Sequence, residues 1–224
     1  VVLVHGGGPL ITSWITKMGI TPRFLDGLRV TDEPSLEIAT AVLCGLINKQ
    51  LVSQLTFLGG KSVGLSGADA GLIQGTVTDA NLGYVAGSVD IDANPIHQLL
   101  SLGYIPVIAP VAVDPSNQHQ LLNVNADTVA GAIARAIGAD NLIFLTDVDG
   151  ILDTNGSLIQ EIDRRSATNL IEKGIVNGGM IPKLNACIEA ADAGAQAYIV
   201  NGTNAGAIPG CLDGTTVGTR VRSR

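Results

Sequence analysis

Two hydrophobic patterns alternate along this chain. Continuous apolar runs, which are typical of strands covered on both faces, lie at 1–4, 104–113, 142–145 and 197–200. Apolar residues spaced three or four apart predict helices between them, at 10–18, 34–57, 95–102, 126–137 and 181–193. Two β-like runs around 79–83 predict a hairpin. This alternation is that of an α/β protein.

The stretch from Leu121 to Leu152 places polar residues before a predicted helix and after a predicted strand. Before the helix, Asn125 or Asp127 can accept hydrogen bonds from its first N–H groups. After the strand comes the polar turn 146–150. Because ligands bind outside the carboxyl ends of strands in open α/β sheets, we expect this stretch to lie at a functional site.

A glycine loop, Gly6 to Gly8, follows the first predicted strand, and Pro9 suits the first turn of the next helix. Backbone N–H groups of such a loop, together with a helix dipole, can bind an anion. A tight strand-to-helix turn explains the same residues. The oxyanion hole of a serine hydrolase is disfavoured, since 64–68 lacks the last glycine of G-x-S-x-G and no histidine lies near the C-terminus.

Two basic residues are candidates for anion binding. The planar fork of Arg29 could bind a carboxylate through two hydrogen bonds, and a surface arginine is the alternative. Lys183 lies in the first turn of a predicted helix, beside Pro182. A cation there is unfavourable against the helix dipole and usually neutralises an anion. A surface lysine is again the alternative.

Composition excludes several classes of protein. The 224 residues are 46% hydrophobic, enough for a large core in one domain or two closely joined lobes. The net charge of −7 and the lack of a basic run argue against a nucleic-acid partner. The widely spaced Cys44, Cys187 and Cys211 indicate reduced thiols in a cytoplasmic protein. We expect no membrane span, since no apolar run reaches that length.

The candidate chemistry lacks a convincing His, Cys or Ser arrangement for nucleophilic catalysis. Phosphoryl transfer to a carboxylate needs no such base, because the nucleophile is already ionised. It needs two anions held in line, with their charge offset by N–H groups, lysine and Mg²⁺. Mg²⁺ can be carried mainly by substrate phosphates and water.

Six motifs then occur in the order and context of one family. They are HGGGP at 5–9, GLRVTD at 27–32, VGLSGAD at 63–69, NVNADTVA at 123–130, LTDVDGIL at 145–152 and GGMIPK at 178–183. Together they resemble the N-acetylglutamate kinases of the amino-acid kinase family over nearly the whole chain. The resemblance implies transfer of the ATP γ-phosphoryl group to the side-chain carboxylate of N-acetyl-L-glutamate, in arginine biosynthesis.

The same resemblance implies a fold and its lobes. The fold is an open three-layer αβα sandwich with a mainly parallel sheet. Residues 1–120 would form an acyl-amino-acid-binding lobe that lacks its first strand and helix, and residues 121–224 an ATP-binding lobe. The family's Lys-x-Gly-Gly strand would precede Val1, so we expect the chain to be truncated at its N-terminus.

Substrate contacts are implied for four residues of the first lobe and its boundary. Gly7 and Gly8 would touch the substrate and the transferring phosphoryl group through backbone N–H. Arg29 would bind a substrate carboxylate. Asn123 would bind the substrate near its α-carboxylate and acetamido group.

Catalytic and nucleotide contacts are implied for the second lobe. Lys183 would stabilise the transferring phosphoryl group, and Asp127 would orient Lys183. The nucleotide would be lined by two segments, Asp147, Val148, Asp149, Gly150, Ile151 and Leu152, and Ile175, Val176 and Asn177. ATP would bring Mg²⁺ with it, and no metal site made of protein ligands is expected.

One departure from the family lies near the C-terminus, where Asn201-Gly202-Thr203 and a glycine-rich loop at 206–214 replace the frequent Asp-Gly-Arg and a downstream His-Ser. This argues against feedback by arginine. The resemblance also implies a dimer or hexamer and, for some members, a PII-type regulator. Two alternatives stay open: a kinase for a carrier-linked aminoadipate or glutamate, suggested by 22–25, and a non-catalytic ligand-sensing subunit of the same fold.

Overall fold

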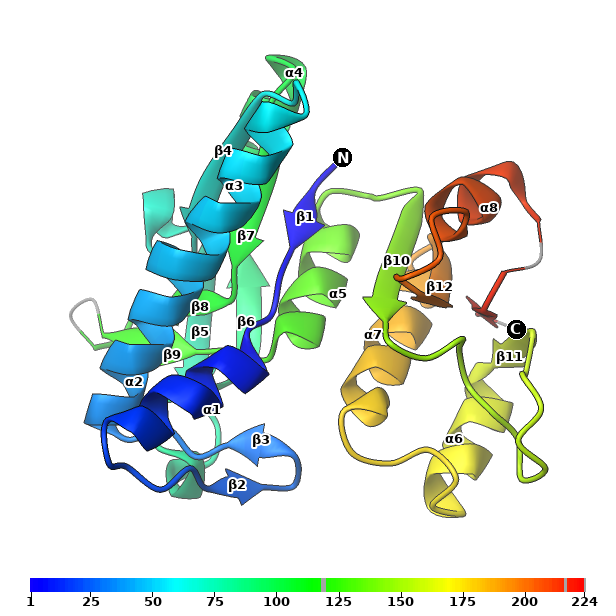
Figure 1. The fold of residues 1–224 in the computed structure, drawn as a ribbon, viewed down its shortest axis with the longest axis horizontal. Coiled ribbons are helices and arrows are strands. Elements are labelled where there is room, and N and C mark those ends of the chain that lie inside the picture. Colours follow the sequence, from blue (N-terminus) through cyan, green and yellow to red (C-terminus); the bar gives the residue numbers. More distant parts are fainter. Residues whose placement is uncertain (118–119, 216, 224) are drawn as a thin grey trace. The chain divides into compact units, whose positions relative to one another are not determined.

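The computed structural model describes residues 1–117, 120–215 and 217–223 (Figure 1). These residues divide into two compact units, Val1–Val129 and Ala130–Arg224. Helix α5 (Ala126–Ala136) runs across the division. Each unit combines helices with parallel strand pairs, which confirms the predicted α/β class.

The first unit contains a parallel sheet in the order β1-β7-β4. Its strands are β1 (Leu3–Val4), β7 (Ile105–Ala109) and β4 (Ser62–Ser66). A second sheet has the order β6-β5-β8-β9. Its strands are β5 (Ile73–Val77), β6 (Ala86–Ile91), β8 (Val111–Val113) and β9 (Leu121–Asn123). Strands β5 and β6 pair antiparallel, which confirms the predicted hairpin.

The apolar run 104–113 is not one strand, as predicted, but two strands in different sheets. Strand β7 pairs with β1 and β4, whereas β8 pairs with β5 and β9. Pro110 separates them, and a proline has no N–H to donate to a ladder. Sequence hydrophobicity alone cannot reveal such a change of partner.

The predicted helix 34–57 is one continuous helix of three parts. They are α2 (Glu33–Thr40), a π-helical segment η1 (Ala41–Ile47) and α3 (Asn48–Phe57). By length and composition this helix could cross a membrane. The prediction that no apolar run reaches the length of a membrane span is therefore wrong. The core helix of a soluble protein can have the same length and hydropathy. Here Ala39, Val42 and Leu43 are buried in a core cluster with Ile11 and Ile15.

Shorter elements complete the first unit. They are α1 (Gly8–Lys17), α4 (Asn94–Ser101), the turns η2 (Asp69–Gly71) and η3 (Ala80–Leu82), and the hairpin of β2 (Phe24–Leu25) and β3 (Leu28–Arg29). The hairpin turns at Asp26 and Gly27, which both have positive φ, as a tight two-residue turn requires. Its register places Phe24 opposite Arg29.

The observed division differs from the lobe boundary expected after Gln120. Strand β9 pairs antiparallel with β8, so Leu121 to Asn123 belong to the first unit. The polar segment 114–120 is the connection between these two strands, although residues 118 and 119 lie outside the described part.

The second unit has a sheet in the order β10-β12-β13-β11. Its strands are β10 (Asn141–Thr146), β11 (Glu161–Asp163), β12 (Gln196–Asn201) and β13 (Thr219–Arg222). Strands β10 and β12 are parallel, as are β11 and β13, while β12 and β13 are antiparallel. The carboxyl ends of β10 and β12 therefore lie side by side.

Helices cover both faces of this sheet. Ala197 and Ile199 of β12 pack in one core cluster with α7 (Met180–Asp192), whereas Tyr198 and Val200 pack in another with α8 (Ala207–Asp213). Successive residues of a strand point to opposite faces, so the second unit is layered α/β/α. The sequence predicted a glycine-rich loop at 206–214. That prediction is wrong, because the segment forms helix α8.

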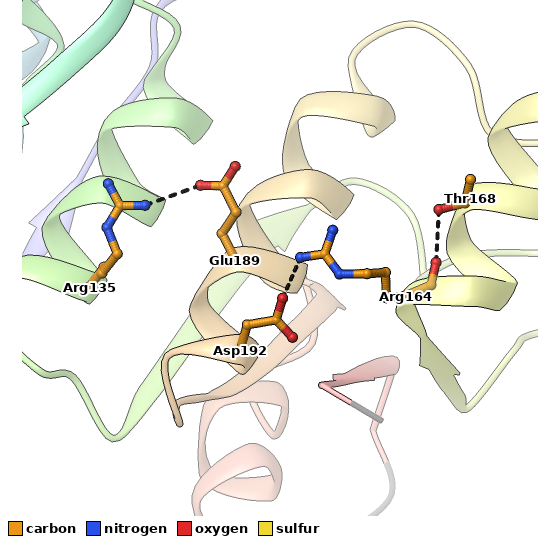
Figure 2. A network of polar contacts seen from close by, with 5 residues as sticks. All are labelled: Arg135, Arg164, Thr168, Glu189 and Asp192. Atoms are coloured by element: carbon orange, nitrogen blue, oxygen red, sulfur yellow. Dashed lines mark hydrogen bonds and ion pairs between the residues drawn. The ribbon is translucent and has the colours of Figure 1, made fainter.

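Ion pairs on the surface connect the helices of the second unit. Arg164 of α6 (Arg164–Glu172) pairs with Asp192 of α7, and Arg135 of α5 lies 3.5 Å from Glu189 (Figure 2). Since these side chains are largely exposed, each pair contributes little, typically about 0–1 kcal/mol. Buried apolar residues of α7, rather than these pairs, fix its place on the sheet.

Candidate functional site

The glycine loop between β1 and α1 has two different glycines. A Cβ on Gly7 would lie 2.6 Å from Cδ1 of Ile47 and 2.9 Å from Cδ2 of Leu43, so close packing against the long helix requires glycine. A Cβ on Gly8 would meet no atom within 4 Å. The space beside Gly8 is therefore open, as an approach to backbone N–H groups at a helix start requires.

Arg29 points its guanidinium at this loop. Its Nη2 donates to the carbonyl oxygen of Gly8 at 3.0 Å and to Oγ1 of Thr12 at 2.7 Å. Its Cζ lies 4.8 Å from the ring centroid of Phe24. Arg29 is only 8% exposed, so the surface alternative is wrong.

The other end of the Arg29 fork has no hydrogen-bond partner among the described residues. Within the described part of the chain, Nη1 is buried and makes no hydrogen bond. Burial lowers the pKa of Arg29, yet a guanidinium keeps its charge at neutral pH. A buried cation held by a carbonyl, a hydroxyl and an aromatic ring is only partly compensated. The site can therefore stabilise a carboxylate at Nη1.

Asn123 joins the same group of residues. Its Nδ2 donates to Oγ1 of Thr31 at 3.2 Å, and that hydroxyl donates to the carbonyl oxygen of Arg29 at 3.0 Å. Three predicted substrate residues are thus connected, since Arg29 bonds Gly8 directly and Thr31 joins Asn123 to Arg29. Thr12 adds a second contact to Arg29. Neither threonine was predicted, although Thr12 lies one helical turn after Gly8 and Thr31 two residues after Arg29.

Asn125, not Asp127, caps helix α5. Its Oδ1 accepts from the backbone N–H groups of Asp127 at 2.9 Å and Thr128 at 3.0 Å. Of the two helix caps that the sequence allowed, Asn125 is therefore the one observed. Asp127 lies in the first turn, where a carboxylate is favoured by the helix dipole.

Lys183 lies near the start of α7 in the second unit. The helix follows Gly179, which offers no side-chain cap, and Gly178 has a φ of +54°. The first N–H groups of the helix therefore lack a cap from this position. A partly buried lysine beside such N–H groups suits an anion.

The loop 147–152 starts at the carboxyl end of β10 and is held by two neighbouring strands. Nδ2 of Asn201, at the end of β12, donates to Oδ1 of Asp149 at 2.8 Å. The N–H of Ile151 donates to Oγ1 of Thr219 at 2.8 Å. Val148 and Leu152 remain 40% and 45% exposed, so the loop presents apolar surface.

The segment 175–177 connects α6 with α7. The N–H groups of Ile175 and Val176 both donate to the carbonyl oxygen of Leu170, at 3.0 and 3.2 Å. The Val176 side chain is buried in the core, whereas Asn177 is exposed. A nucleotide could thus meet the backbone of Val176 but not its side chain.

Comparison with known proteins identifies the family. Residues 1–201 match the sequence profile described as the amino acid kinase family. The chain belongs to the amino acid kinase family. This confirms the family that the six motifs indicated, and with it the amino-acid kinase fold.

Individual amino acid kinases give a finer similarity. The acetylglutamate kinases of Caldanaerobacter subterraneus subsp. tengcongensis and Trichodesmium erythraeum are each 47% identical to this chain, over 90% of its length and 69% and 70% of theirs. The crystal structure of smu.665 from Streptococcus mutans UA159 covers 100% of this chain and 86% of its own, at 27% identity and a TM-score of 0.88. This amino acid kinase is therefore similar in sequence to proteins named acetylglutamate kinase.

No metal site made of protein ligands occurs in the part of this amino acid kinase that the structure describes. No group of three or more His, Cys, Asp or Glu side chains lies close enough there to hold an ion. The three cysteines, Cys44, Cys187 and Cys211, are thiols.

Proposed function

We propose that this chain transfers the γ-phosphoryl group of ATP to the side-chain carboxylate of N-acetyl-L-glutamate. The product is an acyl phosphate used in arginine biosynthesis. The observation that carries the proposal is the buried Arg29, whose Nη1 has no partner in the described part of the chain. The 47% identity to two acetylglutamate kinases supports the choice of substrate.

In this proposal the first unit binds the acyl amino acid. Arg29 takes a substrate carboxylate at Nη1, because its Nη2 is already held by Gly8 and Thr12. Asn123, fixed through Thr31, hydrogen-bonds the substrate beside it. Backbone N–H groups of Gly7 and Gly8 approach the transferring group through the open space at Gly8.

The second unit binds ATP in this proposal. The apolar surface of Val148 and Leu152 suits a purine ring, and both belong to a loop at the carboxyl ends of parallel strands. Ile175 to Asn177 line the same nucleotide. Lys183 offsets the charge of the transferring phosphoryl group. Mg²⁺ would be coordinated mainly by the phosphates and by water, which are its usual ligands in such sites.

The transfer needs no general base. A side-chain carboxylate oxygen of the substrate forms a bond to the γ-phosphorus while the bond from that phosphorus to the β,γ-bridging oxygen breaks. ADP leaves with the electron pair, and no proton moves. The protein contributes position and charge stabilisation, which suffices for phosphoryl transfer.

We place this reaction in the cytoplasm, in keeping with the three thiols. A dimer or hexamer and a PII-type regulator are part of the proposal by similarity to the family. Neither a nucleic acid nor a membrane takes part in it.

The test is ATP turnover by the full gene product with N-acetylglutamate, with the acyl phosphate trapped by hydroxylamine as a hydroxamate. Arg29→Met should raise the KM for N-acetylglutamate about 10²-fold, since a charge-assisted hydrogen bond in a buried site is lost. Arg23→Met, at an exposed arginine just before the same hairpin, is the matched control and should leave that KM unchanged. Lys183→Ala should abolish hydroxamate formation.

Other outcomes select the alternatives. No hydroxamate from folded wild-type protein that still binds N-acetylglutamate would favour a ligand-sensing subunit. If N-acetylglutamate does not bind at all, a carrier-linked aminoadipate or glutamate becomes the substrate to test. Full activity in Lys183→Ala would remove Lys183 from the reaction.

A further inference from the structure

A buried polar network lies directly behind the glycine loop. His5 directly follows β1, immediately before Gly6, and is 7% exposed. Asn48, at the start of α3, is 1% exposed. The two side chains meet with 3.2 Å between Nε2 of His5 and Nδ2 of Asn48. Buried polar groups of this kind need partners, so their pairing fixes how the two elements meet.

The partners of Asn48 determine which way its amide lies. Nδ2 also lies 2.9 Å from the carbonyl oxygen of Val107, which can only accept. On the other side, Nζ of Lys49 lies 3.1 Å from Oδ1, and an ammonium can only donate. Both contacts demand the same orientation. Nδ2 of Asn48 is therefore a donor toward His5.

This orientation sets the protonation of His5. Since Asn48 donates, Nε2 of His5 must accept, and the neutral ring carries its proton on Nδ1. Nδ1 lies 3.1 Å from the carbonyl oxygen of Gly6 and so donates to the glycine loop. Burial lowers the pKa of His5, which favours the same neutral ring.

The loop is also held by the π segment η1, independently of these hydrogen bonds. Leu43 and Ile47, both in η1, leave no room for a Cβ at Gly7. Asn48 follows η1 directly. The segment thus brings apolar contacts and the hydrogen-bonding amide to the same loop. Insertions of this kind in helices often occur at functional sites.

We infer that His5 and Asn48 are positioning residues that set the backbone of Gly6 to Gly8 for the transferring group. The inference rests on the proposed function, which assigns the N–H groups of Gly7 and Gly8 to that group. One ring links the amide of Asn48 to the peptide of Gly6. Turning or losing the ring displaces the peptides that follow.

Kinetics of isosteric His5 variants test the inference. His5→Asn keeps a donor at the position of Nδ1, His5→Gln keeps an acceptor at the position of Nε2, and His5→Leu keeps neither. His5→Leu should lower kcat about 10²-fold, the effect expected of a displacement of about 1 Å. The KM for ATP should stay within about 2-fold, and His5→Asn should recover most of kcat.

A matched control separates positioning from loss of stability. Ile96→Ala removes a fully buried side chain of α4, which is not among the contacts of the loop. It should lower the melting temperature as His5→Leu does, yet keep the wild-type kcat below that temperature. Wild-type kcat in folded His5→Leu, or equal loss of kcat in Ile96→Ala, would overturn the positioning role.

The tautomer offers a measurement that does not depend on activity. The chain has 3 histidines, and His5→Asn identifies the His5 signals in a ¹H–¹⁵N spectrum of the imidazoles. We expect a protonated Nδ1 and an unprotonated Nε2 at neutral pH. A protonated Nε2 would refute the network. Failure of the wild-type protein to form hydroxamate would instead refute the proposed function, before any His5 variant is compared.

Discussion

The two units hold their predicted binding residues in different ways. In the first unit Arg29 and Thr31 are buried, and hydrogen bonds connect them to Gly8 and Asn123. In the second unit the bond between Asp149 and Asn201 is exposed, although the bond between Ile151 and Thr219 in the same loop is buried. A buried and partly unpaired cation is already prepared for one kind of anion, while the exposed part of this loop offers surface that any nucleotide can use. We therefore expect selectivity for the acyl amino acid to come from the first unit.

The largest expected effect separates the two glycines of the first unit. Gly8→Ala should keep the wild-type stability, because its Cβ meets no atom within 4 Å, yet lower kcat/KM about 10²-fold by filling the approach to the loop. Gly7→Ala should instead lower the free energy of unfolding by about 1–3 kcal/mol through overpacking against Ile47. Thermal unfolding and the hydroxamate assay distinguish them. Wild-type kcat/KM in Gly8→Ala would mean that the open space is not part of the site.

A smaller effect tests whether the hydrogen bonds of Thr31 with Asn123 and Arg29 contribute to substrate affinity. Thr31→Val removes the hydroxyl between Asn123 and the Arg29 carbonyl, and Thr31 is 0% exposed. The KM for N-acetylglutamate should rise about 10-fold, since the partly buried Asn123 and the Arg29 carbonyl each lose a partner, with the KM for ATP unchanged. Thr56→Val, which removes an exposed contact with Ser62, is the control. A rise in both KM values would show general damage instead.

The smallest effect belongs to the second unit. Asn201→Asp places a carboxylate beside that of Asp149, where an amide now donates at 2.8 Å. Because the contact is exposed, the repulsion should raise the KM for ATP only about 5-fold and leave the KM for N-acetylglutamate unchanged. The reciprocal pair, Asp149→Asn with Asn201→Asp, restores one donor and one acceptor and should lower that KM again. An unchanged KM for ATP in Asn201→Asp would contradict the loop's role.

Local signals in the sequence predicted much of this fold. Helical spacing after Pro9 and over 34–57 predicted α1 and the long helix, and the polar turn around 79–83 predicted the hairpin of β5 and β6. Arg29 was a candidate from its own chemistry and from the resemblance to a family, whereas Asn123 came from the resemblance alone. Their physical link through Thr31 joins positions 92 residues apart, and no local pattern contains it.

The predictions that failed share one cause. Each depends on which strand or core a segment packs against, and the segment's own residues do not determine this. The run 104–113 is uniformly apolar, but β7 and β8 belong to different sheets. The segment 206–214 contains three glycines and a proline, yet its Ala207 and Cys211 pack against the sheet as part of α8. Tertiary contacts decided each of these against the local pattern.

The π segment has a consequence for insertions and deletions. A π turn accommodates a residue more than an α-helix of the same span, so the helix that holds Asn48 is in effect one residue overlong at 41–47. Deleting one residue from 41–47 would leave a continuous and still amphipathic helix. It would also remove the extra residue and leave a regular α-helix whose later turns keep their phase, so Asn48 would still face His5. The π segment thus lets this helix lose a residue without disconnecting the glycine loop.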